Sequence, residues 1–205
     1  MVDIVFATSN ANKLEEISGI LANSQYNIIT MKQLGIDTQI EEDGNTFYEN
    51  AVKKAVGIMN LTGKPALADD SGIEIDFLNK KPGVHSATFL GADTPYSLRN
   101  AEILKMLKDV PFEKRTARFV CVIAFACTNG NIITSEGIFE GHIAYEAKGK
   151  NGFGYDPIFY VEEYGMTSAE MSTDLKNAIS HRGKALKIMT YKLAEMIDNE
   201  NSYIK

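Results

Sequence analysis

The strongest constraint on the fold is a pair of strand-like segments in the middle of the chain. Residues 117–128 form a nearly unbroken apolar run, and residues 132–138 follow it across Asn129 and Gly130, a pair typical of β-hairpins. Helix-like and strand-like segments are interleaved before and after this hairpin. Interleaving favours a parallel sheet, whereas a long hairpin needs antiparallel neighbours. The sequence therefore predicts an α/β fold with a long mixed sheet.

The first thirty residues predict a strand, a polar turn, a helix and a second strand. Residues 2–7 are apolar and β-branched, and helix-capping types follow them at 8–10. Apolar residues recur at helical spacing between 14 and 21, and residues 26–30 again have strand character. This order agrees with the α/β class.

Helix-capping and helix-ending residues predict the secondary structure of residues 46–72. Thr46 and Glu49 have capping-box spacing, and the helix that they open should end at Gly63. A short strand at 66–68 then runs into residues 69–72, which we expect to form a sharp polar break before another strand.

Three signals predict later helices. Thr94 and Pro95 suit an N-cap and a first helical turn. Thr167 and Glu170 indicate a second helix start. The apolar face of residues 178–198 predicts one last helix.

Composition narrows the class of protein. The 205 residues, 44% hydrophobic and 23% charged, suit one domain over residues 1–205, or one domain with two lobes around a cleft. The net charge is −6 and the sequence has no basic block, which argues against tight binding to nucleic acid.

The two cysteines indicate in which cellular compartment the protein lies. On one strand, Cys121 and Cys127 would share a face roughly 20 Å apart, too far for a disulfide. We expect them to be reduced and buried, as in a cytoplasmic protein. The chain shows neither a signal peptide nor an apolar segment of membrane-spanning length.

The segment Thr8, Ser9, Asn10 and Lys13 stands where a predicted strand passes into a helix. Ligands of open α/β sheets bind beyond the carboxyl ends of strands, and a helix start offers backbone N–H groups and a positive dipole end. With the lysine charge, this place suits a triphosphate. The structural alternative is an ordinary N-cap with a solvated lysine.

Two acidic pairs, at residues 41–42 and 69–70, adjoin predicted strands. Mg²⁺ prefers oxygen ligands and keeps several waters, so one or two carboxylates with phosphate oxygens suffice. The structural alternative is a solvated acidic turn.

Two further segments could hold a flat ligand. Between glycines, Phe153 and Tyr155 could present ring faces, and Asp156 could accept a hydrogen bond from a purine N–H. Lys176 and residues 180–184 supply several donors for a base or a phosphate. The structural alternatives are an aromatic-anchored loop and a basic helix terminus.

In this order, the motifs resemble the inosine triphosphate pyrophosphatase family, the XTP/dITP diphosphatases that cleanse the nucleotide pool. The likeness covers nearly the whole chain. It rests on T-x-N-x-x-K at Thr8, E-E-x-G-x-T-F-x-E-N-A at Glu41, A-D-D-S-G at Ala68, G-F-G-Y-D-P at Gly152 and A-I-S-H-R-G at Ala178.

The resemblance implies an α/β fold with a long mixed sheet, in which helices form two lobes around a central substrate cleft. It also implies a Mg²⁺-dependent, homodimeric hydrolase of non-standard purine nucleoside triphosphates (ITP, dITP, XTP), which yields the monophosphate and pyrophosphate. It implies metal binding by Glu41 and Asp70, although Glu42 could replace Glu41, and it makes Asp70 the proton acceptor. The implied substrate-binding residues are Thr8, Ser9, Asn10, Lys13, Ser71, Phe153, Gly154, Tyr155, Asp156, Lys176, His181 and Arg182.

The implied mechanism is attack of water on the α-phosphorus, with Lys13 stabilising the leaving pyrophosphate. Donors from His181 and Arg182 would match a 6-oxopurine and leave adenine unpaired. Two rivals remain: a Maf-like pyrophosphatase of modified pyrimidine triphosphates, and a non-catalytic nucleotide-binding protein.

Overall fold

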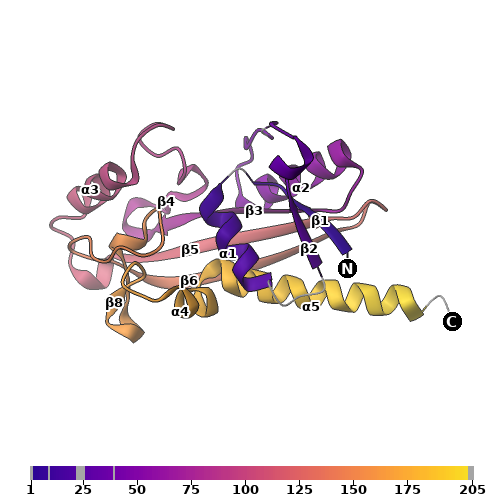
Figure 1. The fold of residues 1–205 in the computed structure, drawn as a ribbon. Coiled ribbons are helices and arrows are strands. Elements are labelled where there is room, and N and C mark those ends of the chain that lie inside the picture. Colours follow the sequence, from indigo (N-terminus) through magenta and orange to yellow (C-terminus); the bar gives the residue numbers. More distant parts are fainter. Residues whose placement is uncertain (1, 9, 22–25, 39, 203–205) are drawn as a thin grey trace. The chain divides into compact units, whose positions relative to one another are not determined.

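The fold is seen in a computed structural model, which describes residues 2–8, 10–21, 26–38 and 40–202 (Figure 1). The strands are β1 (Val2–Phe6), β2 (Tyr26–Thr30), β3 (Ala66–Ile75), β4 (Lys81–Pro82), β5 (Thr116–Ala126), β6 (Ile132–Ile143), β7 (Phe159–Val161) and β8 (Met166–Thr167). The α-helices are α1 (Ala11–Leu21), α2 (Phe47–Thr62), α3 (Tyr96–Met106), α4 (Thr173–Ile179) and α5 (His181–Ser202). Within the described part of the chain, no helix is both long and apolar enough to cross a membrane.

In the described residues one mixed sheet holds eight strands, in the order β2-β1-β3-β5-β6-β7-β8, with β4 paired to β3. β1 is parallel to β2 and β3, whereas the pairs β3–β4, β6–β7 and β7–β8 are antiparallel. The predicted α/β class and mixed sheet are confirmed.

The central hairpin is confirmed and is longer than predicted. β5 and β6 are neighbours in the sheet, and β6 runs on to Ile143. The turn between them is closed by two backbone hydrogen bonds, from Cys127 N to the Asn131 carbonyl (2.8 Å) and from Gly130 N to the Cys127 carbonyl (3.0 Å). Gly130 has a φ of 91°, which glycine adopts at little cost.

The chain divides into two compact units, and each is described by itself. Unit 1 comprises Met1–Asp70, Cys121–Gly137 and Arg182–Lys205, and unit 2 comprises Ser71–Val120 and Ile138–His181. The single domain of two lobes around a cleft stays a prediction.

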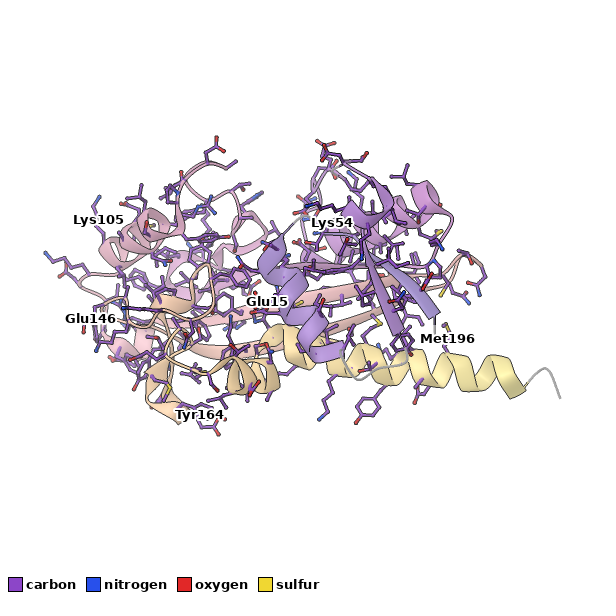
Figure 2. The ribbon with its side chains drawn as sticks, viewed as in Figure 1. Glu15, Lys54, Lys105, Glu146, Tyr164 and Met196 are labelled. Atoms are coloured by element: carbon purple, nitrogen blue, oxygen red, sulfur yellow. The ribbon has the colours of Figure 1, made fainter. Side chains whose placement is uncertain are left out.

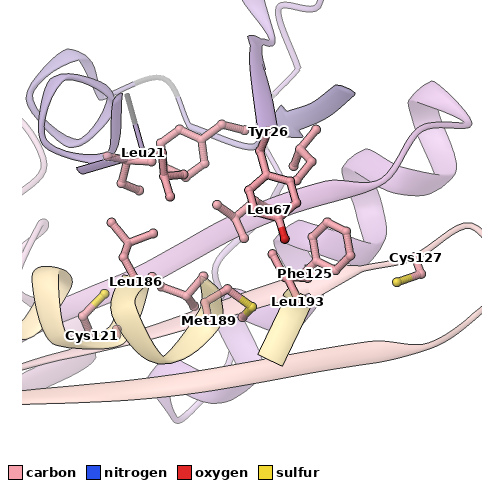
Figure 3. Close-up of a cluster of buried hydrophobic side chains, with 14 residues drawn as sticks. Leu21, Tyr26, Leu67, Cys121, Phe125, Cys127, Leu186, Met189 and Leu193 are labelled. Atoms are coloured by element: carbon pink, nitrogen blue, oxygen red, sulfur yellow. The ribbon is translucent and has the colours of Figure 1, made fainter. Parts of the chain in front are cut away.

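The core of unit 1 joins strand side chains to one face each of α1 and α5 (Figure 3). Ile17 and Leu21 of α1 are four residues apart, so they point to the same side, and both are buried. Cys121 and Cys127 lie in this cluster as buried cysteines that form no disulfide, as predicted. Burial raises the pKa of the Cys121 thiol to about 12, so it stays protonated and unreactive.

The start of α2 follows the predicted capping signal with one change. The Thr46 hydroxyl accepts a hydrogen bond from Glu49 N (3.1 Å), as a capping box requires. The Glu49 carboxylate accepts from Asn45 N (2.7 Å), one residue before the N-cap. Gly63 ends the helix in the left-handed conformation, with a φ of 64°.

The core of unit 2 is built on aromatic rings. Phe159 of β7 packs against Phe119 (ring centroids 4.6 Å apart) and Phe139 (5.2 Å). Ile103 and Leu107, four residues apart at the end of α3, join the same cluster. Close packing of this kind holds the ends of the unit 2 loops in position.

The expected polar break at 69–72 is wrong, because β3 runs unbroken from Ala66 to Ile75. Asp69 and Asp70 are buried on that strand, so the solvated acidic turn is excluded as well. A strand accommodates two buried carboxylates only where partners compensate their charge, and sequence patterning does not show such partners.

Three helix boundaries also differ from prediction. Pro95 itself is the N-cap of α3, and the Thr94 hydroxyl donates to the Leu90 carbonyl instead (2.6 Å). Thr167 ends a strand: its N–H and hydroxyl both bind the Glu170 carboxylate, which makes a turn.

The helix after that turn starts later, and the predicted last helix is two. Ser172 caps α4, accepting from Leu175 N (3.3 Å). Ser180 leaves the helical conformation with a ψ of 164°, so the segment predicted as one helix at 178–198 contains the end of α4 and most of α5.

Candidate active site

Two consecutive aspartates of β3 organise the charged groups of unit 1. Neighbouring strand residues point to opposite faces, so Asp69 and Asp70 meet different partners. Both are almost fully buried, at 1% and 4% exposure. A buried carboxylate needs compensating charge or hydrogen bonds, and each of the two has its own set.

Asp69 joins two cations from distant parts of the sequence. Its Oδ2 lies 3.0 Å from Lys13 Nζ and accepts from Arg182 Nη2 (3.1 Å). Burial alone would raise the pKa of Asp69, but Lys13 and Arg182 outweigh it and hold the pKa far below its ordinary value. Arg182 also pairs with Glu16. Asp69 is therefore ionised, and it fixes the position of Lys13.

Asp70 lies between an amide and a lysine of α2. Asn50 Nδ2 donates to its Oδ2 (3.0 Å), and Lys54 Nζ lies 3.7 Å from its Oδ1. Burial raises the pKa of Asp70, although Lys54 and Lys13 oppose that shift. A buried carboxylate beside a cation, with a raised pKa, has the character of a general base.

Asn50 and Lys54 were missed as site residues by the sequence reasoning. They lie one helical turn apart on the buried face of α2, among positions that a core-facing helix fills with apolar side chains. Two polar residues on an otherwise apolar stripe were the signal that could have identified them. Figure 2 labels the Lys54 side chain. Burial alone would lower the pKa of Lys54, but Asp70, Asp69 and Glu42 raise it, so it keeps its charge.

The start of α1 combines the predicted cap with the predicted cation. Asn10 Oδ1 accepts from Asn12 N (3.0 Å) and Lys13 N (3.3 Å), and Thr8 Oγ1 accepts from Asn10 N (3.1 Å). The cap therefore uses two of these backbone N–H groups, and the binding of a triphosphate by Thr8, Asn10 and Lys13 stays a prediction. The lysine is not a solvated surface charge, since it pairs with Asp69. Ser9 lies outside the described residues.

The first acidic pair lies in the loop before α2. Glu41 is exposed, whereas Glu42 binds Lys54 Nζ through Oε1 (2.6 Å). Among the described residues, no three His, Cys, Asp or Glu side chains cluster as a metal site would require. Mg²⁺ needs only one or two carboxylates when phosphate oxygens and water supply the rest, so Asp70 and one glutamate of this pair are a chemically suitable donor set.

In unit 2 the loop at 152–157 is organised by Asp156. Its Oδ2 accepts from Lys176 Nζ (2.6 Å) and Phe153 N (2.8 Å), and its Oδ1 accepts from the Ser168 hydroxyl (2.8 Å). Lys176 and Asp156 are 8% and 2% exposed. The aspartate therefore ties the loop to α4, and its predicted bond to a purine would compete with these partners.

The aromatic residues of that loop differ in exposure. Tyr155 is buried, donates its hydroxyl to the Ser86 carbonyl (2.8 Å) and meets Tyr96 edge-on, with ring centroids 5.2 Å apart. Burial raises the pKa of its phenol. Phe153 is half-buried, with Lys176 Nζ 5.1 Å from its ring centroid. Of the two rings, Phe153 is the less buried.

The remaining predicted residues fall into both units. His181 is buried in unit 2 and stacks on Phe119, with ring centroids 4.8 Å apart. Ser71 is half-buried on β3 in the same unit. Arg182 belongs to unit 1, where Asp69 and Glu16 bind its guanidinium. Its predicted contact with the base stays a prediction.

Comparison with known proteins shows to which family the chain is similar. Residues 4–192 match the Ham1 family. A dITP/XTP pyrophosphatase of Desulforamulus reducens is 50% identical over 90% of this chain and 92% of its own length. One of Geobacter sulfurreducens is 45% identical over 92% of this chain and 95% of its own.

Comparison with solved structures gives the same family. A HAM1 protein of Coxiella burnetii is 43% identical and superposes with a TM-score of 0.87, covering 95% of this chain and all of that one. The chain belongs to the Ham1 family.

Proposed function

We propose that the protein is a dITP/XTP pyrophosphatase, which hydrolyses dITP, ITP and XTP to the nucleoside monophosphate and pyrophosphate. The observation that carries this proposal is Asp70, a buried carboxylate bound by Asn50 and facing Lys54 in a Ham1-family chain. Relatives that carry the name dITP/XTP pyrophosphatase match about nine-tenths of this chain.

Unit 1 supplies the groups for phosphate chemistry. Lys13 and Lys54 form ion pairs with Asp69 and Asp70, so they bring cations that can offset the negative charge of a triphosphate. Thr8 and Asn10 orient the start of α1 and hence Lys13. Asp70 accepts the proton of the water that attacks the α-phosphorus, and Lys13 stabilises the leaving pyrophosphate.

Mg²⁺ is the proposed cofactor. Asp70 and Glu41 would hold it, because Glu42 is already paired with Lys54 and Glu41 is exposed. When bound, the ion would neutralise phosphate charge and make water more acidic. In its absence the two lysines and Asp69 keep their positions through their own ion pairs.

Unit 2 supplies the groups for the base. Phe153 offers a ring face to the base, and Gly154 allows the base to approach the backbone closely. Tyr155 holds the loop through its hydrogen bond to the Ser86 carbonyl. His181 donates to the 6-oxo group of hypoxanthine or xanthine, and adenine presents a 6-amino donor instead. An unpaired buried donor costs about 1–3 kcal/mol, enough to discriminate against adenine.

The homodimer implied by the family resemblance and the cytoplasmic location suggested by the two buried cysteines remain proposals. Gel filtration with light scattering would measure the first.

The proposal is tested by pyrophosphate release from ITP, dITP, XTP, ATP and GTP, with Mg²⁺ and with a chelator. We expect release from the first three, together with the monophosphate, and none after chelation. Release from modified pyrimidine triphosphates alone would favour the Maf-like rival. Tight nucleotide binding without pyrophosphate would favour the non-catalytic rival.

A further inference from the structure

One face of α3 converges on the loop at 152–157. Tyr96, Arg99 and Asn100 have the i, i+3, i+4 spacing that places side chains together on a helix. The Asn100 amide donates to the Gly154 carbonyl (3.1 Å). A Cβ added to Gly154 would lie 3.6 Å from the Tyr96 ring. This helix face therefore touches the loop at the glycine that we propose for base binding.

Arg99 fixes a second segment that also reaches the loop. Its Nη1 donates to the carbonyls of Ser86 (3.1 Å) and Ala87 (2.7 Å), and its Nη2 donates to those of Gly91 (3.0 Å) and Ala92 (3.1 Å). The guanidinium also lies over the Tyr96 ring, 4.7 Å from its centroid.

The Ser86 carbonyl links the two segments. It accepts the Tyr155 hydroxyl as well as the Arg99 guanidinium. Gly154 is therefore held by Asn100, and Tyr155 is held through Ser86 by Arg99. Two consecutive residues of α3 fix two consecutive residues of the loop.

Burial of the Asn100 side chain costs free energy that a purely structural role does not explain. It is 5% exposed, and its Oδ1 is buried without a hydrogen-bond partner among the described residues. A leucine of similar size would remove this unsatisfied oxygen, but it would also leave the Gly154 carbonyl without the amide donor. A contact that is kept at this cost is expected to act on the loop rather than on global stability.

We propose that Tyr96, Arg99 and Asn100 form a positioning platform that sets base selectivity by holding Gly154 and Tyr155. This inference rests on the proposed function. The contacts described for these residues lie within unit 2, whereas the groups proposed for phosphate chemistry lie in unit 1, so their effect should fall on substrate binding and discrimination, with turnover preserved.

The test is Asn100→Leu in the full-length protein, with Ser97→Ala on the exposed face of α3 as the matched control. We expect KM for dITP to rise about tenfold while kcat stays within about twofold, and the preference for dITP over dATP to fall. The thermal midpoint should change little, because loss of the bond to Gly154 and removal of the unsatisfied Oδ1 offset each other. A large loss of stability with unchanged KM would indicate a purely structural role.

Amide hydrogen exchange of the free protein separates the platform from the proposed activity. Exchange at residues 152–156 should be faster in Asn100→Leu than in wild type or Ser97→Ala. Unchanged exchange and unchanged KM would overturn the platform even in a fully active enzyme. A wild type that releases no pyrophosphate would refute the proposed function and leave the exchange result valid.

Tyr155→Phe is the second variant, because it removes only the hydroxyl bound to Ser86 and keeps the ring. We expect a smaller rise in KM of about threefold, again with kcat preserved. A fall in kcat with unchanged KM in this variant would contradict the positioning role.

Discussion

The two units hold their buried arginines in different ways. In unit 1, Arg182 shares the Asp69 carboxylate with Lys13 and also pairs with Glu16. In unit 2, Arg99 and Arg115 are as buried as Arg182, yet their resolved hydrogen bonds go to backbone carbonyls.

The difference follows from what each arrangement can do. A network of paired charges can accept a polyanion, because its lysines can offset the added negative charge. A guanidinium that grips carbonyls fixes the path of the chain instead. Unit 1 is therefore suited to phosphate chemistry, and unit 2 to shaping loops around a neutral base.

The largest expected effect is on Asp70. Asp70→Asn keeps the shape and the contact with Asn50 but removes the proton acceptor, so kcat should fall by roughly 10²–10⁴-fold. Steady-state pyrophosphate release measures it, with Asp43→Asn in the exposed loop as a control. Turnover within a few-fold of wild type would remove Asp70 from this role.

Asp69 should matter for stability. Asp69→Ala leaves Lys13 and Arg182 without their shared carboxylate, and breaking a buried ion pair costs about 3–5 kcal/mol. Urea unfolding measures the loss. Glu15→Ala, on the exposed face of α1, should change stability by less than about 0.5 kcal/mol (Figure 2). Equal losses in both variants would show that the charge network does not stabilise unit 1.

The sequence predicted the fold class and the central hairpin, because both depend on local patterning. It also placed Lys13 and Asp70 among the site residues. It did not predict that β3 continues through Asp69 and Asp70, since the charges that compensate them come from residues such as Arg182, 113 positions away. Nor did it show that Asp156 is bound by Lys176 and Ser168.

A smaller effect is expected at Gly152 in unit 2. It has a φ of 70°, and an added Cβ would lie 2.2 Å from Asp156 Oδ2. Gly152→Ala should cost about 2 kcal/mol through strain and displacement of that carboxylate. Gly165→Ala shares the positive φ without the clash and should cost about 1 kcal/mol. Equal costs in urea unfolding would mean that the Asp156 carboxylate moves freely.

The smallest effect is the pH dependence of Asp76. Burial would raise its pKa, but bonds from Thr116 and Arg118 lower it. A lowered folded-state pKa stabilises the protein above the unfolded value of about 3.9, and this contribution is lost as pH falls. Asp76→Asn should therefore cost about 0.5 kcal/mol at pH 7, after solvent screening, and less at pH 3. A difference that grew on acidification would have the wrong sign.

The division between a charged unit 1 and a loop-shaping unit 2 is tested most directly by one ratio, kcat/KM for ITP over kcat/KM for ATP. In Lys13→Met we expect both values to fall about a hundredfold and the ratio to hold, because the lysine acts on phosphates common to both. In Phe153→Ala the ratio should fall about tenfold. A ratio that collapsed in Lys13→Met and survived in Phe153→Ala would contradict this account.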